Sequence, residues 1–187
     1  LDVLNDLAFL YMDLVRVGRD DLAQMLLNRY LERDGGFEGM AGFRLFLSYR
    51  ALVRAKVAAL SARRSLAHEY ISLADRLRCA GGSPAMLLTV GLSGSGKSTL
   101  AREVLRIPDV VRVRSDVERK RLHGLGWEAR SGSEVGGGLY SPEVNRAVGL
   151  RLEGLAGSLL ADGYHPLVDA TLLSQSERAR FIDVARE

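Results

Sequence analysis

The chain has 187 residues, of which 47% are hydrophobic and 26% are charged, as in an ordinary globular protein with one or two domains. Its 26 lysines and arginines against 23 acidic residues leave a formal charge of +3, which is too small to indicate nucleic-acid binding from net charge alone. Charged residues interrupt every apolar stretch of about 18 residues, so no membrane span is predicted, and the single cysteine, Cys79, excludes an internal disulfide framework and favours a reducing cytoplasm.

Residues 1–79 show helical periodicity and almost no strand signal. We predict helices over residues 4–15, 20–33, 38–62 and 64–78, with Gly18 and Gly35 as stop signals for the first two. The apolar spacing is that of a packed helical unit, so we interpret its aromatic residues as core. The stretch AGGSP at residues 80–84 breaks the pattern and is the predicted linker between domains at 1–79 and 85–187.

From residue 85 short apolar runs alternate with helical stretches, a pattern typical of βαβ units and a parallel sheet. We predict strands over residues 85–90, 110–113 and 164–168. Ser141 followed by Pro142 predicts the start of a helix that runs to about residue 161, and the stretch from Ser174 to Glu177 predicts a capping box. Pro166 cannot donate to a strand ladder, so it should lie near its strand's start or lack one neighbour.

Directly after the first predicted strand, the stretch GLSGSGKST has the P-loop spacing GxxxxGK[ST]. Glycines allow backbone N–H groups to approach a phosphate closely, and the following helix points its positive end at the anion. A flexible linker is the alternative, but a linker is not expected between a strand and a helix. We therefore predict ATP binding, with these contact residues: Gly91, Ser93, Gly94, Ser95, Gly96, Lys97, Ser98 and Thr99.

Within this motif Lys97 is predicted to place a charge beside the β- and γ-phosphates, and the Ser98 hydroxyl to bind Mg²⁺. Asp169 closes the third predicted strand and resembles a Walker B acid, which holds Mg²⁺ directly or through water. A structural role for Asp169, as a cap of the following turn, remains open.

The second predicted strand leads into RSDVERKRL, which carries Asp116 and, three residues later, Arg119. Polar residues at the carboxyl edge of a parallel sheet lie beside the phosphates in this kind of fold. Asp116 is therefore the predicted general base for an acceptor hydroxyl, and Arg119 is a predicted cation for the acceptor or the transferring phosphate. The alternative is an exposed helix face on which Asp116 is only an N-cap.

Together GLSGSGKST, RSDVERKRL and LVDATLLSQSERARF resemble the small P-loop kinases of the polynucleotide kinase, gluconate kinase and zeta-toxin type, over residues 85–187. The resemblance implies a truncated three-layer α/β/α P-loop NTPase domain behind a helical segment, with a three-stranded parallel sheet in the order 2-3-1. It also implies that the aspartate of DxxR, Asp116, is the acceptor's base. Relatives have about five strands and carry a lid arginine beyond the third.

Residues 2–14 and 49–56 resemble the C-terminal helices of an aminoglycoside phosphotransferase-like domain, and bacterial proteins are known in which such a domain precedes a P-loop kinase-like domain. The nucleotide lobe and the HGD-type catalytic loop of that family do not occur in residues 1–79, so we expect no separate kinase activity there. The resemblance implies a fragment of such a fusion.

The favoured function is an ATP- and Mg²⁺-dependent kinase that phosphorylates the hydroxyl group of a small molecule in the cytoplasm. One alternative is a regulatory module that binds and slowly hydrolyses a nucleotide. Another is a kinase of nucleic-acid ends, which is disfavoured because the basic window at residues 112–121 has no aromatic side chain for base stacking.

Overall fold

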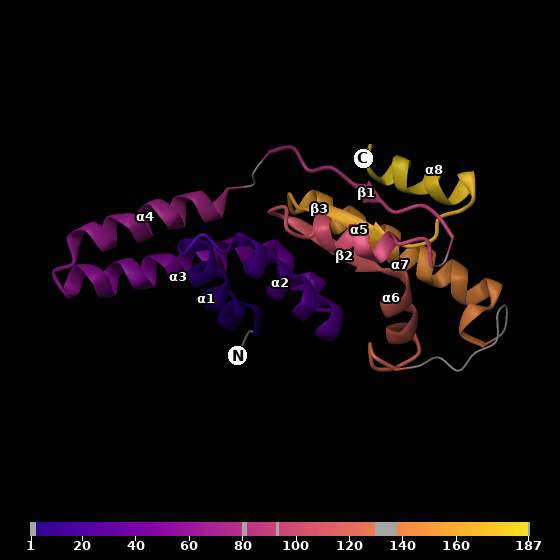
Figure 1. The fold of residues 1–187 in the computed structure, drawn as a ribbon, viewed down its shortest axis with the longest axis horizontal. Helices are drawn as coiled ribbons and strands as arrows, with labels where there is room; N and C mark the ends of the chain where they lie inside the picture. Colours follow the sequence, from indigo (N-terminus) through magenta and orange to yellow (C-terminus); the bar gives the residue numbers. More distant parts are fainter. Residues whose placement is uncertain (1–2, 80–81, 93, 130–137, 187) are drawn as a thin grey trace.

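The computed structural model describes residues 3–79, 82–92, 94–129 and 138–186, and it has a helical end and a sheet end (Figure 1). The helical end contains α1 (Val3–Arg16), α2 (Asp20–Asp34), η1 (Phe37–Gly39), α3 (Met40–Leu60) and α4 (Arg64–Arg78). In Figure 1, α3 and α4 lie side by side and extend away from the sheet. Among the described residues, no helix is both long and apolar enough to cross a membrane.

The helices at residues 1–79 follow the predicted ones closely. The second ends where Gly35 takes the left-handed conformation with φ +76°, and its N–H donates to the Leu31 carbonyl. The third begins at Met40 instead of residue 38, because residues 37–39 form a separate 3₁₀ turn. It ends at Leu60, and Ala62 is in the left-handed region at φ +57°.

The sheet end confirms the predicted three-stranded parallel sheet and its order, with β3 (His165–Asp169) between β1 (Leu87–Leu88) and β2 (Val110–Arg114). The other elements here are α5 (Lys97–Val104), α6 (Ser115–Leu122), η2 (Gly138–Tyr140), α7 (Pro142–Ala161) and α8 (Gln175–Val184). Alternate residues of β2 face opposite sides, so Val110 packs with α5, whereas Val111 and Val113 join the core with α7.

The structure corrects the length of the first predicted strand and explains how Pro166 is accommodated in the third. The first strand was predicted over residues 85–90 but only Leu87–Leu88 pair as a strand. Pro166 is the second residue of β3 and faces only Val111 of β2, since the β1 pairing begins one residue later at Leu167. Its missing N–H therefore costs no hydrogen bond to β1.

Both predicted helix caps are confirmed. The Ser141 hydroxyl accepts from Val144 N–H at 3.4 Å, and Pro142 is the first residue of α7. At α8, the Ser174 hydroxyl accepts from Glu177 N–H at 3.1 Å while the Glu177 carboxylate accepts from Ser174 N–H at 3.0 Å.

The helical end and the sheet end share one hydrophobic core, in which Phe43 and Leu31 belong to the same cluster as Val113 and Phe181. The free edge of β2 is covered by α2 rather than by another strand. Asn28, which is 2% exposed, donates through Nδ2 to the Val110 carbonyl at 3.0 Å and accepts at Oδ1 from Arg112 N–H at 2.8 Å. Its side-chain amide thereby satisfies a strand edge that would otherwise be left unpaired.

Candidate functional site

A cavity of about 370 Å³ lies at the carboxyl edge of the sheet, where three segments meet. The turn before α5 and the first turn of that helix form one wall, the junction of β2 with α6 forms the second, and the end of β3 forms the third. The lining residues are Gly94, Gly96, Lys97, Ser98, Thr99, Arg114, Ser115, Asp116, Asp169, Ala170 and Thr171. Five of the eight predicted P-loop residues, and both predicted carboxylates, therefore line this cavity.

The glycines of the turn adopt backbone conformations that other residues rarely reach. Gly94 has φ +82° and Gly96 has φ +85°, and Gly91 has φ +143°. A Cβ on Gly91 would also come within 3.1 Å of the Ser95 hydroxyl. Gly91 and Ser95 thus shape the turn without lining the cavity, and Ser93 lies outside the described residues.

The turn ends at the N-terminus of α5, where Gly96 is the N-cap and Lys97 the first helical residue. The first N–H groups of a helix have no acceptor within it, so they offer partners and a positive dipole to an anion. The Lys97 ammonium lies over the turn and donates to the Gly91 carbonyl at 2.8 Å and to the Leu92 carbonyl. A positive charge and a helix N-terminus therefore face the same cavity.

Asp116 lies in the first turn of α6 and its side chain is 47% exposed. The N-cap of this helix is Arg114, so Asp116 does not have the capping position that was its structural alternative. Lys120, one turn later, donates to the Asp116 carboxylate at 2.7 Å and to the Trp127 carbonyl at 3.2 Å. The ion pair holds the carboxylate at the wall of the cavity while leaving it open to solvent.

Arg119 does not line this cavity, although it was predicted to act with Asp116. Its Nη1 donates to the Leu139 carbonyl at 2.8 Å and to Asn145 Oδ1 at 2.7 Å, and its guanidinium lies 4.9 Å from the centroid of the Tyr140 ring. These contacts direct the side chain toward the start of α7. The partner of Asp116 at helical spacing is Lys120 instead.

Asp169 ends β3 and is 8% exposed. Its Oδ1 lies 3.4 Å from the Thr89 hydroxyl, whereas its Oδ2 is buried without a hydrogen-bond partner. Within the described part of the chain its carboxylate accepts no backbone N–H from the following turn, so the capping alternative finds no support. Buried polar atoms are nearly always satisfied, and an unpaired carboxylate oxygen in a cavity is therefore a candidate ligand atom.

The residues present fit Mg²⁺ bound together with a nucleotide. Ser98 and Asp169 present a hydroxyl and a carboxylate to one cavity, and Mg²⁺ prefers oxygen ligands, of which a protein often supplies only one or two while phosphates and water supply the rest. Over the same described residues, no group of three or more His, Cys, Asp and Glu side chains forms a metal cage.

Sequence reasoning did not predict the charged residues around Asp169, which are two arginines beside it and a glutamate that contacts both arginines. Arg112 and Arg114 project from the same face of β2, and Arg114 pairs in register with Asp169 of β3. Glu32 of α2 contacts both arginines. The alternation VRVR in a predicted strand was a usable signal for a charged face, but nothing local distinguished Glu32 from the other acids of its helix.

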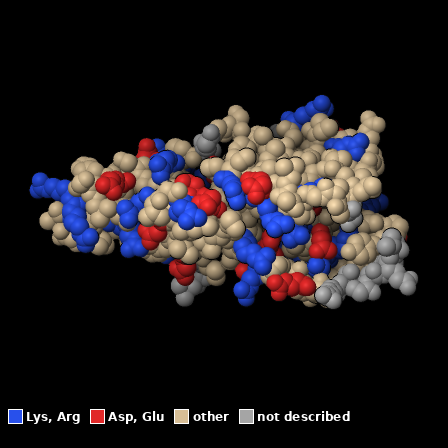
Figure 2. All heavy atoms as spheres, in the orientation of Figure 1, with Lys and Arg blue, Asp and Glu red and all other residues tan. Residues whose placement is uncertain are grey.

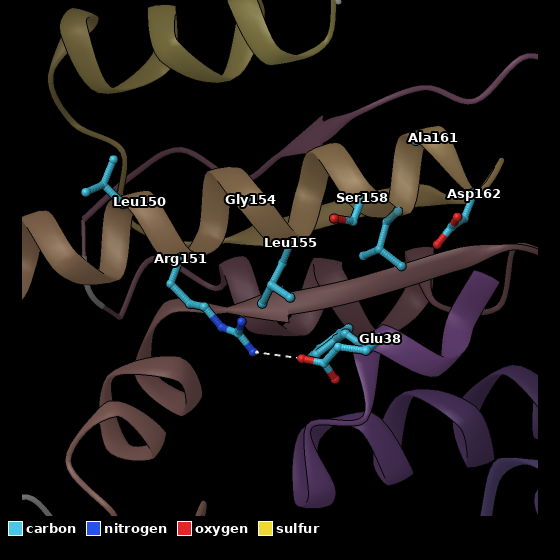
Figure 3. A pocket seen from close by; sticks show the side chains of 10 residues that line it. Glu38, Leu150, Arg151, Gly154, Leu155, Ser158, Ala161 and Asp162 are labelled. Atoms are coloured by element: carbon cyan, nitrogen blue, oxygen red, sulfur yellow. Dashed lines mark ion pairs between the residues drawn. The ribbon is translucent and has the colours of Figure 1, made fainter. Parts of the chain in front are cut away.

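A second cavity, of about 600 Å³, lies between α7 and η1 and is lined by none of the predicted site residues. Figure 3 shows Arg151 of α7 and Glu38 of η1 pointing toward each other, with an ion pair at 3.7 Å. This cavity belongs to the contact between the two ends of the molecule.

The AAA domain model matches residues 86–187, which contain the whole sheet and the cavity at its carboxyl edge. The chain belongs to the AAA domain family. Its helical N-terminus is followed by an α/β domain of the P-loop NTPase type, in agreement with the predicted fold. The match of the AAA domain begins after the predicted linker and does not include the four helices before it.

Three relatives extend the likeness to the helical end. One uncharacterized protein of Mycobacterium bovis and two of Mycobacterium tuberculosis strains are each 34% identical to the chain over 185 residues. Each comparison covers 91% of this chain but 35% of the relative, so the chain spans only part of their length. No solved structure matches the chain significantly.

Proposed function

We propose that this AAA domain is an ATP- and Mg²⁺-dependent phosphotransferase that phosphorylates the hydroxyl group of a small molecule. The supporting observation is that a half-exposed carboxylate, Asp116, lines the same cavity as Lys97 and Asp169. A protein that only binds a nucleotide has no need of a carboxylate there, whereas a hydrolase uses such a group to orient water and a kinase to orient its acceptor. A kinase needs one within reach of the phosphate.

The roles follow from the chemistry of each group. N–H groups of the turn and of the first turn of α5 bind the phosphates, and Lys97 leaves its carbonyl partners to neutralise their charge. Ser98 and Asp169 hold Mg²⁺, which when bound offsets the charge of the transferring phosphoryl group. Asp116 orients the acceptor hydroxyl and takes its proton, while Lys120 keeps the carboxylate in place.

Two competing functions find less support. A nucleic-acid end would need a continuous basic track, but basic and acidic side chains are interspersed over most of the face shown in Figure 2. A hydrolysing regulatory module would use Asp116 only to orient water, and the labelled-ATP experiment below separates it from the kinase. For the location of the protein, we propose a reducing cytoplasm, which agrees with the exposed free thiol of Cys79.

A further proposal concerns residues 1–79, which we propose are the C-terminal helices of an aminoglycoside phosphotransferase-like domain. The support is the resemblance of residues 2–14 and 49–56, and these stretches lie largely in α1 and α3. A solved structure of one of the longer relatives tests this directly. A lobe before α1 without the fold of that family would contradict it.

The function is tested by incubating the protein with γ-labelled ATP, Mg²⁺ and a pool of sugars, polyols, nucleosides and amino alcohols. Label in a small molecule supports the kinase, and label only in free phosphate contradicts it. Asp116→Asn should keep ATP binding and reduce transfer by a factor of about 10² to 10⁴. Asp75→Asn, which removes an exposed carboxylate paired with Arg78 at 2.9 Å, is the control and should transfer like the parent.

A further inference from the structure

A cluster of four charged side chains joins the helical end to the proposed Mg²⁺ site. Glu32 comes from α2, Arg112 and Arg114 from β2, and Asp169 from β3. The side chains of Glu32, Arg112 and Asp169 are 5%, 9% and 7% exposed, and Arg114, at 27%, opens onto the cavity. Because these charges are largely shielded from water, the attraction between each guanidinium and its nearest carboxylate is strong and fixes where the guanidinium lies.

The two arginines differ in how they contact the two carboxylates, since Arg114 lies 3.8 Å from Glu32 Oε1 and 3.7 Å from Asp169 Oδ2, whereas Arg112 is hydrogen-bonded to Glu32. Arg112 donates to Glu32 Oε1 from Nε at 2.9 Å and also from Nη2. By contrast, its Nη1 stays 3.8 Å from Asp169 Oδ2, and Arg114 Nε stays 3.7 Å from the same oxygen. Both distances exceed that of a charge-assisted hydrogen bond. Glu32 therefore holds Arg112 in a fork-like contact, and Asp169 Oδ2 remains without a hydrogen bond.

We propose that Glu32 is a positioning residue of the nucleotide site: its carboxylate holds Arg112 off Asp169 and so keeps Asp169 Oδ2 available to Mg²⁺. The inference rests on the proposed function, in which Asp169 holds that ion. Without the Glu32 charge, Asp169 is the remaining carboxylate of the cluster, and a shift of about an ångström gives either arginine a direct hydrogen bond to it. That hydrogen bond would compete with the metal for the same oxygen.

A purely structural role for Glu32 can be separated from this one because the chain contains a matched carboxylate. Glu118 of α6 is 2% exposed at its side chain and also contacts two arginines, Arg121 and, at 3.3 Å, Arg151. The Arg151 contact ties α6 to α7, while Arg121 of α6 itself also donates to the Glu32 carbonyl at 3.0 Å, and none of these contacts involves Asp169. Neutralising Glu118 therefore reports the cost of losing a buried carboxylate whose arginine partners do not contact Asp169.

The test is a calorimetric titration with ATP, in the presence and in the absence of Mg²⁺, on the whole protein. The quantity compared is the ratio of the two affinities. Glu32→Gln should lower this preference for Mg²⁺·ATP about tenfold, as outer-shell partners of metal ligands do, while ATP without metal binds as in the parent. Glu118→Gln should leave the ratio unchanged, and Glu32→Asp, which keeps the charge, should restore most of it.

An unchanged ratio in Glu32→Gln, or an equal change in Glu118→Gln, overturns the proposal. If Glu32→Gln does not fold, Arg114→Gln decides instead: removing a cation beside Asp169 should maintain or raise the preference for Mg²⁺·ATP, and a lower preference contradicts the role. Failure of the proposed function looks different. If the parent binds Mg²⁺·ATP but transfers no label to a small molecule, the proposed function fails while the role of Glu32 stands; if the parent binds no Mg²⁺·ATP, both proposals are overturned.

Discussion

The two ends of the parallel sheet each bring arginine and aspartate together, but with different geometry. At the amino edge, Arg44 of α3 pairs with Asp109 at 3.1 Å, donates to the Gly163 carbonyl at 3.0 Å and lies 4.4 Å from the centroid of the Tyr164 ring. At the carboxyl edge, Arg112 and Arg114 stay 3.8 and 3.7 Å from Asp169, whose Oδ2 has no hydrogen bond.

The difference separates a structural contact from a binding site made of the same residue types. The amino-edge groups meet across the contact between α3 and the sheet, where Arg44 and Asp109 also line a cavity of about 220 Å³. Their ion pair offsets part of the cost of burial, while Arg44 Nε and Nη1 have no hydrogen-bond partner among the described residues. At the carboxyl edge the unpaired atom is a carboxylate oxygen of Asp169, which can bind a cation, whereas the Asp109 carboxylate at the amino edge is already paired with Arg44. Substitutions at the amino edge should therefore change stability, and those at the carboxyl edge should change ligand binding.

The largest effect is expected for Lys97→Ala at the carboxyl edge. Loss of an ammonium that contacts phosphate should weaken Mg²⁺·ATP binding about a hundredfold, measured by calorimetry. Without nucleotide the free energy of unfolding should change by less than about 0.5 kcal/mol, because the ammonium meets only carbonyls of its own turn. Equal ATP affinity in the parent and the variant would contradict the proposed site.

Next in size is Asp109→Asn at the amino edge. Asp109 has φ +63°, a conformation that asparagine also tolerates, so the backbone should persist while the ion pair with Arg44 is lost. The free energy of unfolding should fall by about 2 kcal/mol because the Arg44 guanidinium stays buried with less compensation. Urea denaturation measures this loss. A change in the ATP affinity of the folded variant would contradict the expectation that the amino edge contributes only to stability.

Asn28→Ala tests the free edge of β2, the side of the sheet that runs between its amino and carboxyl edges. The substitution leaves the Val110 carbonyl and the Arg112 N–H without their partners and should cost about 1.5 kcal/mol of stability. Asn5→Ala is the control, since its Oδ1 contacts Arg50 within the helical end, and it should cost less. A cost for Asn28→Ala no larger than for this control would mean that the β2 edge does not depend on α2.

The smallest effect is expected for Tyr164→Phe and depends on pH. Burial raises the pKa of Tyr164, and likewise that of Tyr11, above the ordinary value for a phenol. A raised folded-state pKa means that this stability is complete below about pH 10 and is lost as the pH rises further. Tyr164→Phe should cost about 1 kcal/mol at neutral pH, through the lost bond to the Met40 carbonyl at 3.2 Å.

Above pH 10 the variant should then lose stability less steeply than the parent, because one fewer buried phenol must ionise. Urea denaturation at several alkaline pH values compares the two slopes. Equal slopes would show that the Tyr164 hydroxyl ionises as readily in the folded as in the unfolded chain.

Local signals predicted most of the fold. Helix stop signals such as Gly35, and caps such as Ser141 and Ser174, act within one or two turns of the helix. They can therefore be recognised from the local sequence alone. The glycine spacing of the P-loop is local for the same reason. Only two residues of the first predicted strand form a strand, because strand pairing also requires a partner far along the chain.

The site was predicted less completely. The motifs identified Lys97, Ser98, Asp116 and Asp169, which line one cavity. The direction of Arg119 was not predictable, since it depends on Tyr140 and Asn145, more than 20 residues later. That Arg119 contacts the acceptor or the phosphate stays a prediction.

The sequence by itself determined the helices and the residues able to bind a phosphate and a metal ion, and its resemblance to the P-loop kinases implied the strand order. The tertiary structure alone decided which charges meet. Glu32 reaches Arg112 across 80 positions of the chain and Asn28 reaches the edge of β2 across 82. No periodicity or spacing records such contacts, because they depend on how α2 packs beside the sheet, and that packing follows from the shared core of both ends.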